Sequence, residues 1–444
     1  YPVLKGCRYH YQMETPTHDL DGYEMILTTS WIQVFLRLDA TRQYAVSEWQ
    51  QAVDALTHRY PVLKGCFKME GPKPVRSDTC DLPNVTHSTV TDPEEQEKRL
   101  KEYKTEHVSP DPIPFSSPLL MLHVEELPLP GTATRYILTV SINHAVSDAR
   151  TVFFCAHQLL QTLTGTAPED EVFPYQAKRD CFLPMSEWDT QDIPEDWKID
   201  KDTITPCPFP KAEKAGGFVI RWASAPVSDV LAKCKAHGTT IQGLALAAQT
   251  GTVFLGREDP ALCYAMVPVD TRGHPRAVPE YTLDTQTSGA GSIYPRVETR
   301  PKPTWALAKE WSDQVAALRG SDGPVLHVLM LAECIPKLYA PDTMSERETQ
   351  LWAGRAPTPD CNIMASNVGR SHLVSSYGDG DLTLPDGAFM FPFSPCPPGS
   401  NGSIIHCYTV GDKLVWGWNC CDHVDKDTRD RCFDEICRVM RCDM

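Results

Sequence analysis

The chain has 444 residues and carries 42 Lys and Arg against 58 Asp and Glu, a net charge of −16 that would repel phosphate backbones and anionic membrane surfaces. Nucleic acid is therefore not an expected partner. The sequence contains no run of about 18 apolar residues, so we do not expect it to insert into a membrane. The chain is too long for one ordinary hydrophobic core, and its 41% of hydrophobic residues is typical of globular proteins, so we expect two domains.

The cysteines argue against two further classes of protein. The 17 Cys are scattered and include no Cys-x-x-Cys pair, so they indicate reduced thiols in a cytoplasmic protein rather than a disulfide scaffold or a zinc site. Five of them gather near the end of the chain, where their spacings match no standard ligand pattern and predict no bound metal. These five are Cys420, Cys421, Cys432, Cys437 and Cys442.

The first half of the chain alternates strands and helices. Met25 to Leu38 is rich in β-branched and aromatic residues and predicts a strand. Ser47 then begins a helix that has Trp49 and Val53 on one face. The other elements expected before residue 136 are a strand over Tyr60 to Met69, a charged helix over Asp92 to Tyr103, and the first strand of a hairpin over Leu119 to Glu125.

Tyr136 to Leu163 predicts a strand, a turn and a helix with a histidine at the corner. Apolar residues alternate from Tyr136 to Ile142, and His144 is in phase with them, so its imidazole should point inward at the strand end. Beyond Asp148 the apolar residues recur at helical spacing, so the chain should turn and pack back on the strand. A potential base therefore lies at this corner, with a carboxylate four residues on.

The pattern His-x-x-x-Asp is loose, and a chain with 14 His should contain it roughly once by chance. It occurs here from His107, from His144 and from His423. Only His144 has a strand before it and a helix after it, whereas the other two lie in segments typical of surface loops. On the pattern alone, a structural and a catalytic histidine are equally well supported.

The second half follows a long acidic, proline-rich connection. We divide the chain into a first half over 1–180, a crossover segment over 181–217 and a second half over 218–444. The elements expected in the second half are strands over Phe218 to Trp222, Leu262 to Pro268, Cys361 to Asn367, Ile404 to Val410 and Leu414 to Asn419, and helices over Val227 to Ala236, Thr239 to Ala248, Thr304 to Leu318, Leu326 to Tyr339 and Arg429 to Met440. Alternation in both halves predicts an α/β fold.

Five segments in the same order resemble motifs of the His-x-x-x-Asp acyltransferase superfamily. They are Tyr60 to Phe67, His144 to Asp148, Thr239 to Ala248, Val267 to Arg272 and Ser366 to Gly369. The superfamily includes the plant BAHD enzymes, chloramphenicol acetyltransferase, peptide-synthetase condensation domains and fungal trichothecene O-acetyltransferases. Ala149 stands where the family usually has Gly, and the Asp-Phe-Gly-Trp-Gly motif of the plant branch is absent, so we favour the fungal trichothecene 15-O-acetyltransferase type on length and overall pattern.

The resemblance implies two chloramphenicol-acetyltransferase-like α/β domains with a channel between them and His144 at its middle. It implies a CoA-dependent O-acyltransferase, with an alcohol such as a terpenoid as acceptor, acetyl-CoA or another acyl-CoA as co-substrate, and no permanently bound cofactor. His144 would be the general base. Asp148 would be a structural partner that pairs with Arg272, and Ser292 and Asn367 are candidates for stabilising an oxyanion. A monomer is expected.

Other readings stay open. Ser292 and Asn367 also lie in ordinary turn-forming segments, and Arg272 could be a solvated surface charge. The same fold could carry a carrier-dependent condensation, a ring-closing reaction or a non-catalytic binding function. A serine hydrolase is disfavoured because no Gly-x-Ser-x-Gly occurs, and the glycine motifs of phosphate-loop and dinucleotide-binding proteins are also absent.

Overall fold

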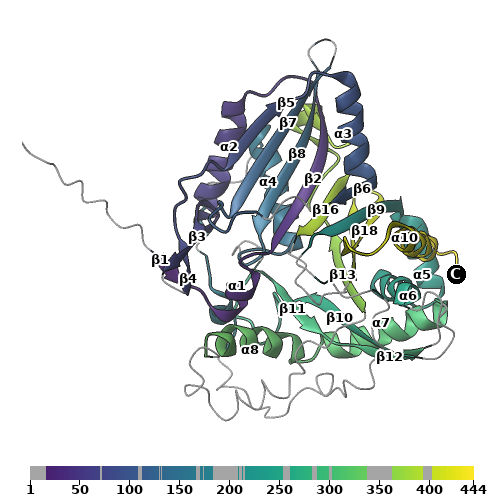
Figure 1. Ribbon diagram of the computed structural model, residues 1–444. Helices are drawn as coiled ribbons and strands as arrows, with labels where there is room; N and C mark the ends of the chain where they lie inside the picture. Colours follow the sequence, from purple (N-terminus) through teal and green to yellow (C-terminus); the bar gives the residue numbers. More distant parts are fainter. Residues whose placement is uncertain are drawn as a thin grey trace, which may run out of the picture.

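The computed structural model describes residues 17–70, 73–108, 113–129, 131, 133–166, 171–173, 175–183, 209, 213, 216–253, 261–282, 288–299, 303–337, 363–393 and 403–444. These residues form two large mixed sheets and a small antiparallel one, each bordered by helices (Figure 1). The small sheet contains β1 (Thr17–Asp19), β4 (Lys73–Ser77) and β3 (Cys66–Glu70).

The first large sheet is built around two long neighbouring strands, β2 (Trp31–Ala40) and β8 (Thr134–Asn143). Beyond β8 follow β7 (Leu120–Pro128) and β5 (Val85–Thr89), and beyond β2 follow β15 (Leu382–Thr383) and β14 (Ser376–Tyr377), while β16 (Ala388–Phe393) also pairs with β2. The helices α2 (Val46–Arg59) and α4 (Ala149–Leu163) pack against each other and against this sheet.

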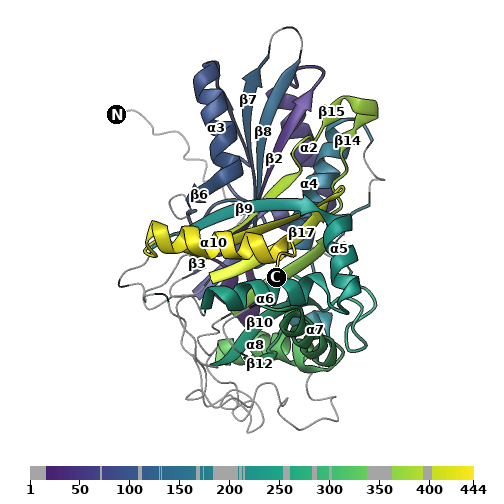
Figure 2. The ribbon, with the colours of Figure 1, turned by 90° about the vertical axis from the view of Figure 1, so that its right-hand side faces the viewer.

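The second large sheet has the strand order β11 (Ala290–Ile293), β10 (Ala261–Asp270), β13 (Ile363–Arg370), β17 (Ser403–Val410), β18 (Lys413–Cys421), β9 (Phe218–Pro226) and β6 (Glu106–Val108), with β12 (Arg296–Thr299) on β10. Figure 2 shows α10 (Lys426–Met440) and α6 (Ile241–Val253) in front of this sheet, with α5 (Val227–Ala236) and α7 (Trp305–Arg319) beside them. The helix α8 (Gly323–Lys337) packs on β11 and on α1 (Gly22–Leu27), and α3 (Pro93–Thr105) packs on β9.

The two large sheets exchange strands. The strand β6 comes from the first half of the chain and joins the second sheet, whereas β14, β15 and β16 come from the second half and join the first. The division of the chain at 181–217 therefore follows chain order, and it does not separate the strands of one sheet from those of the other. Because the exchanged strands hold the sheets together, a cavity between them has a fixed frame.

The α/β alternation expected from the sequence is present, and most expected elements agree with the structure to within a few residues. The expected helix over Val227 to Ala236 matches α5, and the expected hairpin is the antiparallel pair of β7 and β8. Most of the connection expected between residues 168 and 217, and the first 16 residues, lie outside the described residues.

Two expected strands are wrong in part. Within Met25 to Leu38 the chain first completes α1, because Asp21 and Glu24 cap the start of that helix reciprocally, with N–H to carboxylate distances of 2.9 and 2.8 Å. Within Tyr60 to Met69 the residues Pro61–Lys64 form a 3-10 turn, since proline suits the first position of a helix. In both cases residues that favour the start of a helix, a capping box or a proline, outweighed the β-propensity of the segment.

The helix α6 packs closely on its neighbours through small residues. Leu244, Ala245 and Ala248 are fully buried in the core of the second sheet. A Cβ at Gly243 would lie 2.1 Å from Ser312 Oγ and 2.3 Å from the Ala308 carbonyl oxygen. Glycine is therefore required there by the approach of α7, despite its poor helix propensity.

We expect Gly243→Ala to lower the free energy of unfolding by about 1–3 kcal/mol, because overpacking forces α6 and α7 apart. Urea denaturation measures the change. Gly320→Ala is the matched control, since a Cβ at Gly320 meets no atom within 4 Å. Equal stability of the two variants would contradict the close packing of these helices.

Candidate active site

The corner between β8 and α4 is held by the side chain of Asn143. Its Oδ1 accepts from the Ala145 N–H at 2.9 Å, and its Nδ2 donates to the Thr28 carbonyl at 2.8 Å. The Ser147 hydroxyl donates back to the Asn143 carbonyl at 2.9 Å. These bonds fix the turn that carries His144.

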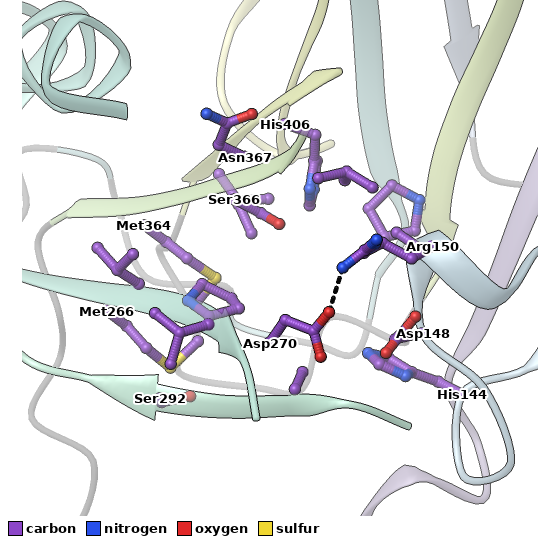
Figure 3. A pocket seen from close by; sticks show the side chains of 18 of the residues that line it. His144, Asp148, Arg150, Met266, Asp270, Ser292, Met364, Ser366, Asn367 and His406 are labelled. Carbon is purple, nitrogen blue, oxygen red and sulfur yellow. Dashed lines mark hydrogen bonds and ion pairs between the residues drawn. The ribbon is translucent and has the colours of Figure 1, made fainter. Parts of the chain in front are cut away.

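The orientation of His144 fixes its chemistry. Its Nδ1 lies 2.7 Å from the Ser147 carbonyl oxygen. A carbonyl can only accept, so Nδ1 carries the proton, and in the neutral ring Nε2 holds the lone pair. His144 is half-buried and lines a cavity between the two large sheets (Figure 3). In the neutral ring, Nε2 is therefore the basic nitrogen.

Asp148 caps α4 and reaches the second sheet. Its Oδ1 accepts from the Thr151 N–H at 2.9 Å, and its Oδ2 lies 2.8 Å from Arg272 Nη2 and accepts from the Gly289 N–H at 2.5 Å. The ion pair that the sequence analysis expected between Asp148 and Arg272 is therefore present. It joins the helix behind His144 to the residues that follow β10.

Arg272 is nearly buried, with a side-chain exposure of 7%. Burial opposes its charge, yet the neighbouring Asp148 carboxylate, with Tyr281 and Asp270, holds the pKa of Arg272 above its ordinary value. The reading of Arg272 as a solvated surface charge is therefore wrong. A Cβ at residue 289 would lie 2.2 Å from Arg272 Nη1, so Gly289 is needed for the close approach of backbone and guanidinium.

A second ion pair joins the same elements beside His144. Arg150, on the first turn of α4, pairs with Asp270 at the end of β10 (Figure 3). Asp270 Oδ1 also accepts from the backbone N–H of Arg272 at 3.1 Å. The sequence analysis did not identify Arg150 or Asp270, although Asp270 lies inside the quoted segment Val267 to Arg272.

The cavity has a volume of about 880 Å³ and is lined mainly by apolar side chains. Its apolar walls include Met266, Met364, Met390, Ile404, Leu331 and Ile26. Elements from both sheets contribute to it, as expected for a site between two domains. A largely apolar cavity with a few polar groups is typical of a site for small molecules.

The two oxyanion candidates both line the cavity. Ser292 comes from β11 and Asn367 from β13, and in Figure 3 both lie apart from His144. Asn367 Oδ1 accepts from the Gly369 N–H at 3.1 Å, which is the turn bond that the alternative reading expected. The amide nitrogen of Asn367 is thus the atom that could donate to a ligand.

Two further polar pairs in the cavity were missed. Tyr294 directly follows β11, and its hydroxyl lies 2.9 Å from Nε2 of His327 in α8. Both residues are buried. His406 of β17 and Asn419 of β18 also line the cavity. The sequence marks these residues only as polar side chains at inward positions of strands or helices. That pattern does not show which part of the structure the side chain faces.

No group of three or more His, Cys, Asp or Glu arranged to hold a metal ion occurs among the described residues. In the same part of the chain, no helix is long and apolar enough to cross a membrane.

The order of the strands and the position of the cavity between the two sheets define a class of protein fold. This is the chloramphenicol-acetyltransferase and condensation-domain type of acyltransferase fold, shared by acyl-CoA-dependent O-acetyltransferases and by peptide-synthetase condensation and epimerization domains. The two-domain fold expected from the sequence is thereby confirmed. No protein-family model and no curated protein matches the sequence, so the likeness is one of structure.

Three solved structures illustrate this structural likeness. The trichothecene 15-O-acetyltransferase TRI3 from Fusarium sporotrichioides is similar with a TM-score of 0.68 and 11% identity, over 96% of this chain and 94% of that one. TRI101 from F. sporotrichioides, complexed with Coenzyme A and T-2, has a TM-score of 0.58 and 15% identity over 93% and 96%. The epimerization domain from the third module of tyrocidine synthetase B has a TM-score of 0.61 and 14% identity over 96% of both chains.

We expect Asp148→Asn to lower the free energy of unfolding by about 3 kcal/mol, because it leaves the buried Arg272 charge with only the more distant carboxylate of Asp270, 3.3 Å from Nη1. Urea denaturation measures the loss. Asp425→Asn is the matched control, since Asp425 caps α10 through the Thr428 N–H at 2.9 Å, but at the surface. Similar small losses in the two variants would show that the ion pair contributes little.

Burial, opposed by the nearby Asn419 side chain and assisted by the nearby His144, lowers the pKa of His406 to about 3. Histidine in the unfolded chain titrates near pH 6.5, so between these values the unfolded state binds the extra proton and acidification destabilises the fold. Relative to His406→Gln, wild type should lose about 1.4 kcal/mol of unfolding free energy per pH unit between about pH 6 and 4. Parallel profiles for the two proteins would refute the buried, neutral state of His406.

Proposed function

We propose that the protein is a CoA-dependent O-acyltransferase, most simply an O-acetyltransferase, that acylates a hydroxyl of a small apolar alcohol such as a terpenoid. The observation that carries this proposal is His144, whose Nδ1 is engaged by the Ser147 carbonyl at 2.7 Å while the ring lines the cavity between the sheets. The fold supports it, and TRI101 is described as complexed with Coenzyme A.

In the proposed reaction His144 acts as general base. The acceptor hydroxyl gives its proton to Nε2 while its oxygen attacks the thioester carbonyl carbon of acyl-CoA. The tetrahedral intermediate then collapses, the carbon–sulfur bond breaks, and His144 returns the proton to the leaving thiolate. The products are the ester and free CoA, and no acyl-enzyme is needed. Holding both substrates in one cavity removes much of the entropic barrier.

Asp148 and Arg272 act as positioning residues in this proposal. Asp148 accepts from the Thr151 N–H and pairs with Arg272, so it fixes the start of α4 immediately after the His144 turn. Two candidates remain for donating to the oxyanion, the hydroxyl of Ser292 and the amide nitrogen of Asn367. Arg319 and Arg370 line the cavity and are exposed, and we propose them as contacts for the phosphates of CoA.

The proposal further holds that the protein acts as a monomer in the cytoplasm and needs no permanently bound cofactor. Carrier-dependent condensation and ring closure remain the alternatives on this fold. They differ in what they require: the first needs a phosphopantetheinyl protein, and the second needs no acyl donor.

Thiol release from acetyl-CoA in the presence of a panel of hydroxylated terpenoid and polyketide alcohols tests the proposal. We expect release to need an alcohol, and His144→Ala to reduce it by about a hundredfold or more, because the general base is lost. His423→Ala is the matched control, since His423 begins another His-x-x-x-Asp sequence, in a turn after β18. Undiminished release by His144→Ala would refute the assigned role, and no release with any alcohol would favour one of the alternative reactions.

A further inference from the structure

One wall of the cavity is a sheet face made by β17, β18 and β9. The register pairs Ile404 with Asn419 and His406 with Gly417 across β17 and β18, and it continues to Ile220 and Trp222 of β9. Residues paired in this way, and those two positions further along, share one face of a sheet. Among the six positions in these two rows, His406 and Asn419 are polar, and Ile404, Gly417, Ile220 and Trp222 are apolar or glycine. Ile404, His406 and Asn419 all line the cavity.

These two polar side chains are buried with atoms left unsatisfied. His406 is 5% exposed and Asn419 is 3% exposed. By distance and angle, His406 Nε2 and Asn419 Oδ1 have no hydrogen-bond partner among the described residues, although Asn419 lies near enough to His406 to oppose the fall in the pKa of its imidazole. A buried donor or acceptor without a partner destabilises a fold, and such groups are rare in native proteins unless a ligand or water satisfies them.

The opposite face of the same strands differs. There Ile405, Cys407, Trp416 and Trp418 pack into the apolar core beneath the helices. Two indole N–H groups on that face, Trp416 Nε1 and Trp418 Nε1, are also buried without a hydrogen-bond partner in the described part of the chain. They lie in the core, however, whereas His406 and Asn419 line the cavity, where a ligand can reach them. In Figure 3, His406 and His144 lie on opposite sides of the Arg150–Asp270 ion pair.

The hydrogen-bonding capacity of His406 and Asn419 suits one kind of ligand group, a hydroxyl. Asn419 Oδ1 accepts a hydrogen bond, and the imidazole of His406 can donate or accept at Nε2 according to its tautomer. A hydroxyl can donate to one of these atoms and accept from the other. The surrounding wall, which includes Met364, Met390 and Ile404, suits an apolar skeleton.

We propose that His406 and Asn419 bind a second hydroxyl of the acceptor, so that the substrate is a rigid, apolar molecule with at least two hydroxyls, one acylated at His144 and another held by this pair. This inference rests on the proposed acyl transfer for the role of His144. The recognition itself is a binding event and can be measured without an acyl donor.

The first test compares stability. Asn419→Leu should leave the urea midpoint unchanged or raise it, because an apolar side chain replaces an unsatisfied polar one on an apolar wall. Asn143→Leu is the control, since Asn143 is also buried but both of its polar atoms are engaged, Oδ1 by the Ala145 N–H at 2.9 Å and Nδ2 by the Thr28 carbonyl at 2.8 Å, and its loss should lower the midpoint. A drop in Asn419→Leu as large as that of the control would make the pair structural and overturn the proposal.

The second test measures the binding of androstanediol and androstanol, which share one rigid skeleton and differ by one hydroxyl, through tryptophan fluorescence with no acyl-CoA present. Wild type should bind the diol about tenfold or more tightly than the mono-alcohol, and Asn419→Leu should lose this preference while still binding the mono-alcohol. Equal binding by wild type, a preference that survives in Asn419→Leu, or no binding of either alcohol would count against the proposal.

The two proposals fail in different ways. Selective binding of the diol without thiol release from acetyl-CoA would leave this inference standing and refute acyl transfer. Thiol release at equal rates with diols and matched mono-alcohols would support acyl transfer and overturn the recognition of a second hydroxyl.

Discussion

The buried ion pair between Asp148 and Arg272 is the interaction on which the site depends. Two charges removed from water need compensating partners, and here Asp148 also accepts from the Thr151 and Gly289 N–H groups while Arg272 also donates to Thr151 Oγ1. The pair joins the start of α4 to the residues after β10. His144 lies one turn before that helix, so its position relative to the second sheet follows from this contact.

The exchange of strands between the sheets supplies the frame around that contact. The strand β16 pairs with β2 along its whole length, and β6 pairs with β9, so each large sheet contains chain from both halves. The chain therefore crosses from one sheet to the other at each exchanged strand and tethers them. The side chains on the two walls decide what can enter the cavity between them.

In the two proposals, different residues on the walls serve the reaction and the recognition of the substrate. His144, with its turn bonded through Asn143 and Ser147, provides one prepared lone pair. Three pairs of side chains add polar groups at separate places on an otherwise apolar surface. They are Arg150 with Asp270, Tyr294 with His327, and His406 with Asn419. Such an arrangement can hold an apolar molecule in one orientation by a few directed hydrogen bonds.

The amino-acid sequence alone determined the order of strands and helices and the corner at His144, and the resemblance that its motifs carry implied the partner of Asp148. It did so because alternation, helical spacing and capping are local, and because the five motifs occur in the order that the resemblance requires. Local signals also misled it, as at α1, where a short capped helix looked like the start of a strand. The exchange of β16 and β6, the pairing of Arg150 with Asp270, and the gathering of His406 and Asn419 on the cavity wall were decided only by the tertiary structure. These contacts join residues far apart in the chain, and no periodicity within one segment records which distant side chain will face it.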